Sequence, residues 1–126
     1  MIKVQYIDND AFLAKRIQNE LTRLKFQVDI SASGAETLSR FKEDKPDILI
    51  INLQLQDMDG EDLLVEIRKL NKDIKILMMT RIAPETEEIL FNIQMLALKE
   101  KGASGLLLKP FAVEKLIQKI HEHVQP

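Results

Sequence analysis

The chain has 126 residues, with 18 Lys or Arg against 20 Asp or Glu, so its net charge is −2 and its length fits one domain. This near-neutral balance argues against a surface for nucleic acid or an anionic membrane, and the lack of Cys excludes disulfide bonds and thiolate metal sites. No apolar run approaches the roughly 18 residues of a membrane span and the N-terminus has no secretory signal, so we expect a cytoplasmic domain that contacts no membrane.

The first part of the chain alternates between the patterns of strands and helices. Lys3–Ile7 is rich in β-prone residues, and from Ala11 the apolar residues recur at helical spacing, with Asp10 placed to cap the helix. Residues 26–32 alternate apolar with polar side chains, which predicts a strand with one polar face. Residues 35–42 then predict a second, short helix.

The rest of the chain continues this alternation. Ile48–Ile51 is a run of four apolar residues, a pattern typical of a central parallel strand buried on both faces. The elements predicted after it are a helix that includes Leu63 to Leu70, a strand over 74–79 that ends at Thr80, a long helix over 85–101 stopped by Gly102, a short strand over 106–108 and a last helix over 113–124.

Strand and helix therefore alternate five times, without an internal repeat or linker. Short connections of this kind imply one α/β domain over residues 1–126, with a doubly wound, five-stranded parallel sheet and five helices. In such a sheet, sites form beyond the carboxyl ends of the strands. The residues at those ends are Asp8, Asn9, Asn52, Thr80 and Lys109.

Several short motifs, in this order and at these strand ends, resemble the receiver domain of bacterial two-component response regulators. The motifs are Tyr6-Ile7-Asp8-Asn9-Asp10, Pro46-Asp47-Ile48-Leu49-Ile50-Ile51-Asn52, Met58-Asp59-Gly60, Met79-Thr80, Gly102-Ala103 and Leu108-Lys109-Pro110-Phe111. The resemblance covers the chain from Lys3 to about Val124 and implies the flavodoxin-like receiver fold. The 29 positions from Thr80 to Lys109 predict a fourth helix that is extended relative to receivers in general.

The resemblance implies a phosphoryl-transfer site that this chain matches only in part. Receivers accept a phosphoryl group from a histidine kinase on an Asp at the end of the third strand, and that position is Asn52 here. Their acidic pair, which holds Mg²⁺, corresponds to Asp8 and Asn9. Their phosphoryl-binding Thr or Ser and Lys correspond to Thr80 and Lys109, which match.

These replacements change the chemistry expected of the pocket. A carboxamide is a poor nucleophile because its nitrogen lone pair is delocalised, so phosphoryl transfer to Asn52 by the usual route is not available. Since Asn9 is neutral too, two of the three carboxylates around the metal are missing, and we expect no cofactor and weak or absent Mg²⁺ binding. Lysine is seldom buried without a partner, so we predict that Lys109 pairs with Asp8 while Asn52 supplies a carbonyl oxygen.

Other positions near the pocket also bear on its function. Leu106 stands where receivers usually have an aromatic switch residue, and the resemblance implies a cis peptide bond between Lys109 and Pro110. Asp57 and Asp59 follow the third strand. We interpret them as a solvated acidic turn rather than as a displaced phosphoacceptor.

The predicted fourth helix has two apolar faces. The stripe predicted to face the core consists of Ile89, Leu90, Ile93, Leu96 and Ala97. A second stripe, nearly opposite, consists of Phe91, Met95 and Leu98. We predict that this second stripe is a partner surface, since contiguous exposed apolar residues often mark interaction sites. The alternative is that the segment is irregular, or that an added turn folds back and buries Phe91.

These observations favour a regulatory module of signal transduction that works without phosphorylation, through protein contacts of the face formed by the fourth helix, fifth strand and fifth helix. We expect a protein partner, either a second copy or an output domain, and no nucleic acid. The alternative is a phosphorelay receiver phosphorylated at Asp8 or Asp57, within a longer transcriptional regulator. An enzyme is disfavoured because no Gly-rich phosphate loop or Ser-His-Asp set is present, and His121 and His123 lie on the last helix.

Overall fold

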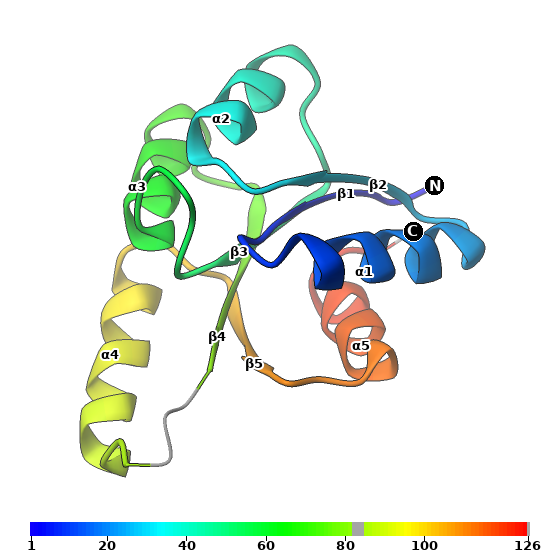
Figure 1. Ribbon diagram of the computed structural model, residues 1–126. Helices are drawn as coiled ribbons and strands as arrows, with labels where there is room; N and C mark the ends of the chain where they lie inside the picture. The colour runs from blue at the N-terminus through cyan, green and yellow to red at the C-terminus, as the bar shows by residue number, and fades with distance from the viewer. Residues whose placement is uncertain (82–84, 126) are drawn as a thin grey trace.

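The computed structural model describes residues 1–81 and 85–125, in which strands and helices alternate five times (Figure 1). The strands are β1 Lys3–Ile7, β2 Gln27–Ser31, β3 Ile48–Asn52, β4 Lys75–Arg81 and β5 Gly105–Lys109. The helices are α1 Ala11–Arg23, α2 Gly34–Glu43, α3 Gly60–Leu70, α4 Glu88–Glu100 and α5 Val113–His123. Within the described residues, no helix has the length and apolar character needed to cross a membrane.

The five strands form one parallel sheet in the order β2-β1-β3-β4-β5. Helices α1 and α5 cover one face of the sheet, and α2, α3 and α4 lie on the other side (Figure 1). All five residues of β3 are buried, as the unbroken apolar run Ile48–Ile51 predicts. The predicted doubly wound α/β fold is confirmed. Its strand order reverses between β1 and β3, which places a crevice at their carboxyl ends.

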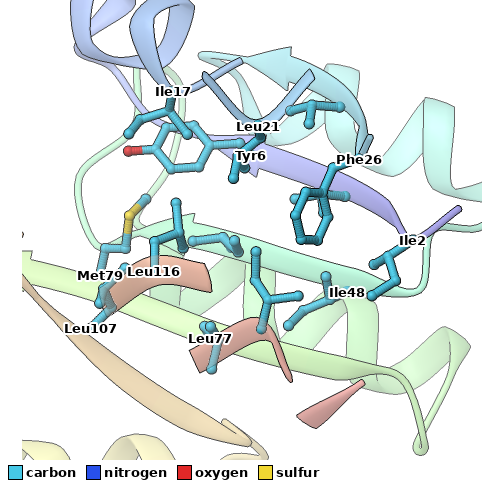
Figure 2. Close-up of a cluster of buried hydrophobic side chains, with 14 of the residues drawn as sticks. Ile2, Tyr6, Ile17, Leu21, Phe26, Ile48, Leu77, Met79, Leu107 and Leu116 are labelled. Carbon is cyan, nitrogen blue, oxygen red and sulfur yellow. The ribbon is translucent and has the colours of Figure 1, made fainter. Parts of the chain in front are cut away.

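A separate apolar core lies on each face of the sheet. The core under α1 and α5 joins strand residues such as Tyr6 and Leu77 to Ile17 and Leu116 of these helices (Figure 2). The core under α2, α3 and α4 includes Phe41, Leu64 and Leu98 among its members. Both cores use the two sides of the same strands, which fixes the carboxyl ends of β1, β3, β4 and β5 relative to one another.

Local signals in the sequence set the ends of several elements. The Asp10 side chain accepts a hydrogen bond from the Leu13 N–H at 3.0 Å, which confirms it as the cap of α1. Gly60 opens α3 in close contact with β3, because a Cβ at this position would lie 2.1 Å from the Asn52 carbonyl oxygen. Only glycine allows the chain after Asn52 to return this closely to the strand.

Helix α4 is shorter than the sequence predicts. It begins at Glu88 rather than Glu85, ends at Glu100, and with 13 residues is as long as α1. Strand β4 is correspondingly longer, since it continues past Thr80 to Arg81. Residues 82–84 of the predicted connection lie outside the described residues. Arg81 therefore belongs to the strand and residues 85–87 precede the helix, so the predicted helix over 85–101 is wrong at its start.

Helix α4 also turns toward the core the side that was predicted to face outward. Met95 and Leu98 are buried, with 7% and 1% of their surface exposed, and Phe91 is half-buried against the same core. The stripe predicted to face the core is instead largely exposed: Ile89, Leu90, Ile93 and Leu96, with Ala97 half-buried. The prediction that Phe91, Met95 and Leu98 form an exposed partner surface is therefore wrong.

The C-terminal end of α4 explains this rotation. Gly102 adopts a φ of 114°, and the Arg68 guanidinium of α3 donates to its carbonyl oxygen at 2.7 and 2.9 Å. The Ala103 N–H donates to the Leu98 carbonyl oxygen at 3.0 Å. These bonds hold the last turn of α4 against α3 with Leu98 inward. Because both faces of the helix are apolar, periodicity alone could not distinguish this rotation from the opposite one.

A pair of leucine substitutions tests which face of α4 is buried. Leu98→Ala should lower the free energy of unfolding by about 2–5 kcal/mol, because it opens a cavity in the core. Leu96→Ala removes the same atoms from an exposed position and should change stability by less than about 1 kcal/mol. Urea unfolding of both variants, at one low protein concentration, measures the difference. Equal losses would contradict the observed rotation.

Candidate functional site

A polar cavity of about 620 Å³ opens at the carboxyl ends of the strands. Its lining includes Asn9, Asn52, Thr80, Arg81 and Lys109. Four of these were predicted from the strand ends, and the structure brings them together. Arg81 was not predicted, because the sequence places the end of β4 one residue too early. The cavity is therefore the place where the candidate site residues meet.

A buried ion pair between Asp8, which follows β1, and Lys109, the last residue of β5, lies at this site. The Lys109 ammonium lies 2.5 Å from Asp8 Oδ2, and the two side chains expose only 6% and 0% of their surface. The Asp10 N–H donates to Asp8 Oδ1 at 3.0 Å, and the Tyr6 O–H donates to Asp8 Oδ2 at 3.3 Å. The predicted Lys109–Asp8 pair is confirmed. Every charge in it has a partner, which a buried ion pair requires.

Tyr6 is a member of this network that the sequence analysis missed. Burial, together with the nearby Asp8 carboxylate, raises the pKa of the Tyr6 phenol, so the hydroxyl stays protonated and acts as a donor. Residues two apart on a strand project on the same face. That period of two is the signal in the sequence that could have linked Tyr6 to Asp8.

The two amides at the acidic positions bond to each other. The Asn52 side-chain N–H₂ donates to Asn9 Oδ1 at 3.2 Å and to the Gln54 carbonyl oxygen at 2.9 Å. Asn52 thus acts as a donor, which corrects the prediction that its carbonyl oxygen would serve Lys109. Two carboxylates at these positions would repel each other without a cation between them, whereas two amides can form this bond.

Thr80 and Leu106 are less closely engaged. The half-buried Thr80 donates its hydroxyl proton to the Arg81 carbonyl oxygen at 3.3 Å, a local backbone contact. Leu106 is half-buried and packs against the core under α2, α3 and α4, so it does not line the cavity. The Lys109–Pro110 peptide bond is cis, as the resemblance implies.

Asp57 has a structural role that the sequence analysis did not foresee. Its carboxylate accepts hydrogen bonds from the backbone N–H groups of Gly34 at 2.8 Å and Ala35 at 3.0 Å, and from the Ser33 hydroxyl at 3.3 Å. These donors belong to the start of α2, and their bonds lower the pKa of Asp57. Asp57 therefore caps α2 from a distant segment, while it and Asp59 remain exposed as the predicted solvated acidic turn requires. Asp59 takes the N-cap position of α3 without a side-chain cap bond.

The two histidines lie far from this cavity. A Cβ on Gly105, the first residue of β5, would lie 2.8 Å from His123 Nε2, which places His123 at the opposite end of the strand from Lys109. The His121 ring lies 5.9 Å from the Phe26 ring. Neither histidine is therefore placed to take part in chemistry at the cavity.

Breaking the ion pair tests its contribution to stability. Lys109→Met leaves the buried Asp8 carboxylate without its cation and should lower the free energy of unfolding by about 3–5 kcal/mol. Asp8→Asn should have a similar cost for the converse reason. The double variant should lose less than the sum of the single variants, because neither charge then lacks a partner. Additive losses in a urea-unfolding cycle would show that the two groups do not interact.

The pH dependence of stability tests the Asp57 cap. The depressed pKa means that Asp57 stabilises the folded chain above its unfolded pKa of 3.8, and that this contribution disappears as pH falls through the folded pKa. Asp57→Asn should therefore lower the unfolding temperature at neutral pH. The gap between the variant and the parent chain should close below about pH 4. A gap that is constant with pH would contradict the cap.

Comparison with known proteins identifies relatives over almost the whole chain. The sequence profile described as "Response regulator receiver domain" matches residues 4–121. The chain is 28% identical over 118 residues to "Probable transcriptional regulator ycf27" of Porphyridium aerugineum, covering 94% of this chain and 46% of that protein. It is 23% identical over 121 residues to "Chemotaxis protein CheY" of Bacillus subtilis, covering 95% of each.

Solved structures show the same fold. A putative response regulator from Chloroflexus aurantiacus matches with a TM-score of 0.82 at 28% identity, covering 96% of this chain and 95% of that one. The chain spans about half the length of several curated relatives that it matches, such as the response regulator MprA of Mycobacterium bovis at 49%. These relatives therefore contain a further segment of similar length.

Proposed function

This chain belongs to the response regulator receiver family, and we propose that it is a signalling module that works without phosphorylation of Asn52. Receiver domains transmit signals through contacts with other proteins, and a phosphoryl group normally changes those contacts. In this chain the residue at the end of β3 lacks a nucleophilic oxygen. The proposal is that its regulatory contacts are made in one fixed state of the pocket.

The Asp8–Lys109 pair is the observation that carries this proposal. In a phosphorylated receiver the lysine is expected to bind the phosphoryl group, whereas here it is engaged by Asp8 at 2.5 Å. The Asn52 amide is likewise engaged by Asn9 and the Gln54 carbonyl oxygen. Both groups have partners within the chain, so the pocket is stable without a ligand.

The residues present do not fit the Mg²⁺ ion that the fold family implies. Mg²⁺ prefers carboxylate and phosphate oxygens in an octahedral arrangement. Asp8 is buried against Lys109, and the Asn9 oxygen accepts from Asn52. Across residues 1–81 and 85–125, no three His, Asp or Glu side chains are grouped so that they could hold a metal ion. We therefore propose weak or no Mg²⁺ binding and assign no step to the ion.

The output of the module is proposed to be a protein contact of the face formed by α4, β5 and α5. This face carries exposed aliphatic side chains on α4, and Leu108 on β5, a residue that is 42% exposed. Exposed apolar groups of this kind mark interaction surfaces on soluble domains. The proposal keeps the face predicted from the sequence but replaces its residues, since the outward side of α4 is the opposite one.

The main alternative is a phosphorelay receiver that accepts its phosphoryl group on another Asp. Both candidates are engaged in the structure: Asp8 is fully buried in its ion pair, and Asp57 caps α2. Phosphorylation of either would first require these bonds to break. A role within a longer transcriptional regulator is compatible with both hypotheses, because relatives such as the ycf27 protein and MprA are about twice as long.

Treatment with acetyl phosphate and Mg²⁺, followed by mass spectrometry of the intact chain, tests the proposal. We expect no gain of a phosphoryl group, because Asn52 offers no carboxylate to attack phosphorus. Calorimetric titration with Mg²⁺ alone should give no saturable binding. A gain of one phosphoryl group, removed by Asp8→Asn or Asp57→Asn, would support the alternative instead.

The double variant Asn9→Asp/Asn52→Asp is the matched control. It returns both carboxylates to a pocket that still contains Asp8, Thr80 and Lys109. We expect this variant to bind Mg²⁺ and to gain one phosphoryl group under the same conditions, since a dication then has three carboxylates to bind. This contrast would show that the two amides, rather than another feature of the chain, prevent phosphorylation.

A further inference from the structure

A second cavity, of about 230 Å³, lies between the first turn of α1 and the connection from β5 to α5. Its apolar wall consists of Phe12, Leu13, Pro110 and Phe111. Its lining does not include Asn9, Asn52 or Thr80, so it is distinct from the pocket of the two amides. Sites for drug-sized molecules measure roughly 300–1,000 Å³, so this cavity suits a smaller ligand.

Two aromatic rings from different elements contribute to this wall. Phe12 of α1 exposes 85% of its surface and belongs to neither core. Phe111 follows β5 and is half-buried against the core under α1 and α5. A ring as exposed as that of Phe12 is removed from water when another ring packs against it. The wall is therefore suited to a ligand with an aromatic body.

The ends of β4 and β5 place two cations at this cavity. Met79 of β4 and Leu107 of β5 belong to the core under α1 and α5. Arg81 and Lys109 each come two residues later, so they project on the same side of the sheet, and they are paired in the register of the two strands. Asp8 neutralises Lys109 at 2.5 Å. Arg81 is then the cation that this pair leaves without a carboxylate.

Asp10 supplies a negative charge to the same lining. Its Oδ1 accepts from the Leu13 N–H at 3.0 Å, and its side chain is exposed. In the part of the chain that the structure describes, neither Asp10 nor Arg81 forms a salt bridge, whereas Arg16, the remaining charge of the lining, lies 3.5 Å from Glu20. The cavity therefore presents one cation and one anion that are not paired with each other.

We propose that this cavity binds the zwitterion of a small aromatic α-amino acid, with its carboxylate on Arg81, its ammonium on Asp10 and its ring against Phe12 and Phe111. An anion alone would bring a second negative charge close to Asp10, and a cation alone would bring a second positive charge close to Arg81. A zwitterion gives each group a partner of opposite charge. The inference goes beyond the proposed function and does not depend on it.

Titration of the ¹⁵N-labelled 126-residue chain with L-phenylalanine at neutral pH, followed by ¹H–¹⁵N NMR, tests the site. We expect saturable shifts of the amide signals of Phe12, Arg81 and Phe111. The dissociation constant should be about 1–10 mM, because the ligand is small and both charged groups are open to solvent. 3-Phenylpropionate, which lacks the ammonium, and 2-phenylethylamine, which lacks the carboxylate, should each bind about fivefold more weakly.

Two conservative variants test the roles of the charges. Arg81→Gln should remove the advantage of phenylalanine over 2-phenylethylamine, because the carboxylate then has no cation to bind. Asp10→Asn should remove its advantage over 3-phenylpropionate while retaining the cap of α1, since Asn serves as well as Asp at an N-cap. Arg23→Gln, the same change at an exposed position at the other end of α1, should leave all three affinities unchanged. Circular dichroism and thermal unfolding of each variant check that the fold is retained.

Three results would overturn this inference. One is the lack of any saturable shift up to about 20 mM phenylalanine. Shifts confined to α4 would place binding at its exposed aliphatic side chains instead of this cavity. An Arg81→Gln variant that still prefers phenylalanine to 2-phenylethylamine would contradict the assigned contact. None of these measurements concerns phosphorylation, which the mass measurement on the intact chain decides separately.

Discussion

The site is organised around one buried ion pair. Asp8 and Lys109 are almost wholly removed from solvent, and a buried charge is tolerated only with a partner and satisfied hydrogen bonds. The Tyr6 hydroxyl and the Asp10 N–H complete the bonds of the carboxylate. Since one carboxylate balances one ammonium, the buried pair is neutral without a dication. The replacement of two further carboxylates by Asn9 and Asn52 makes this balance possible, and the two amides bond to each other.

The position of the pair in the sheet extends its effect beyond the pocket. Asp8 follows β1 and Lys109 ends β5, and the sheet order places β3 and β4 between them. Their contact therefore ties the carboxyl ends of four neighbouring strands into one arrangement. The end of β5 is part of the face that also includes α4 and α5. A stable Asp8–Lys109 pair thus favours a single state of that face. This is compatible with the proposal that the contacts of the module do not depend on a phosphoryl group.

The sequence predicted most of the fold and the membership of the site, because both depend on strong local patterns. The unbroken apolar run Ile48–Ile51 identifies a central strand, and a lysine after an apolar strand requires a buried partner such as Asp8. The rotation of α4 was not predictable in this way, because both sides of the helix are apolar and bonds from Arg68 to Gly102 hold it. The Asp57 cap depends on a contact between distant segments. The orientation of Asn52 depends on which of its two amide groups finds a partner.

The net charge of −2 can be related to the residues of the pocket. Aspartates at positions 9 and 52 would make it −4, and both missing charges belong to one pocket. A ligand shifts a conformational equilibrium only when it binds one state better, and in receivers the phosphoryl group supplies that difference. Under the proposed function this chain has no such ligand, and its contacts are made in one state of the pocket. The two neutral amides in the pocket and the four exposed aliphatic side chains on α4 are then features of that one state.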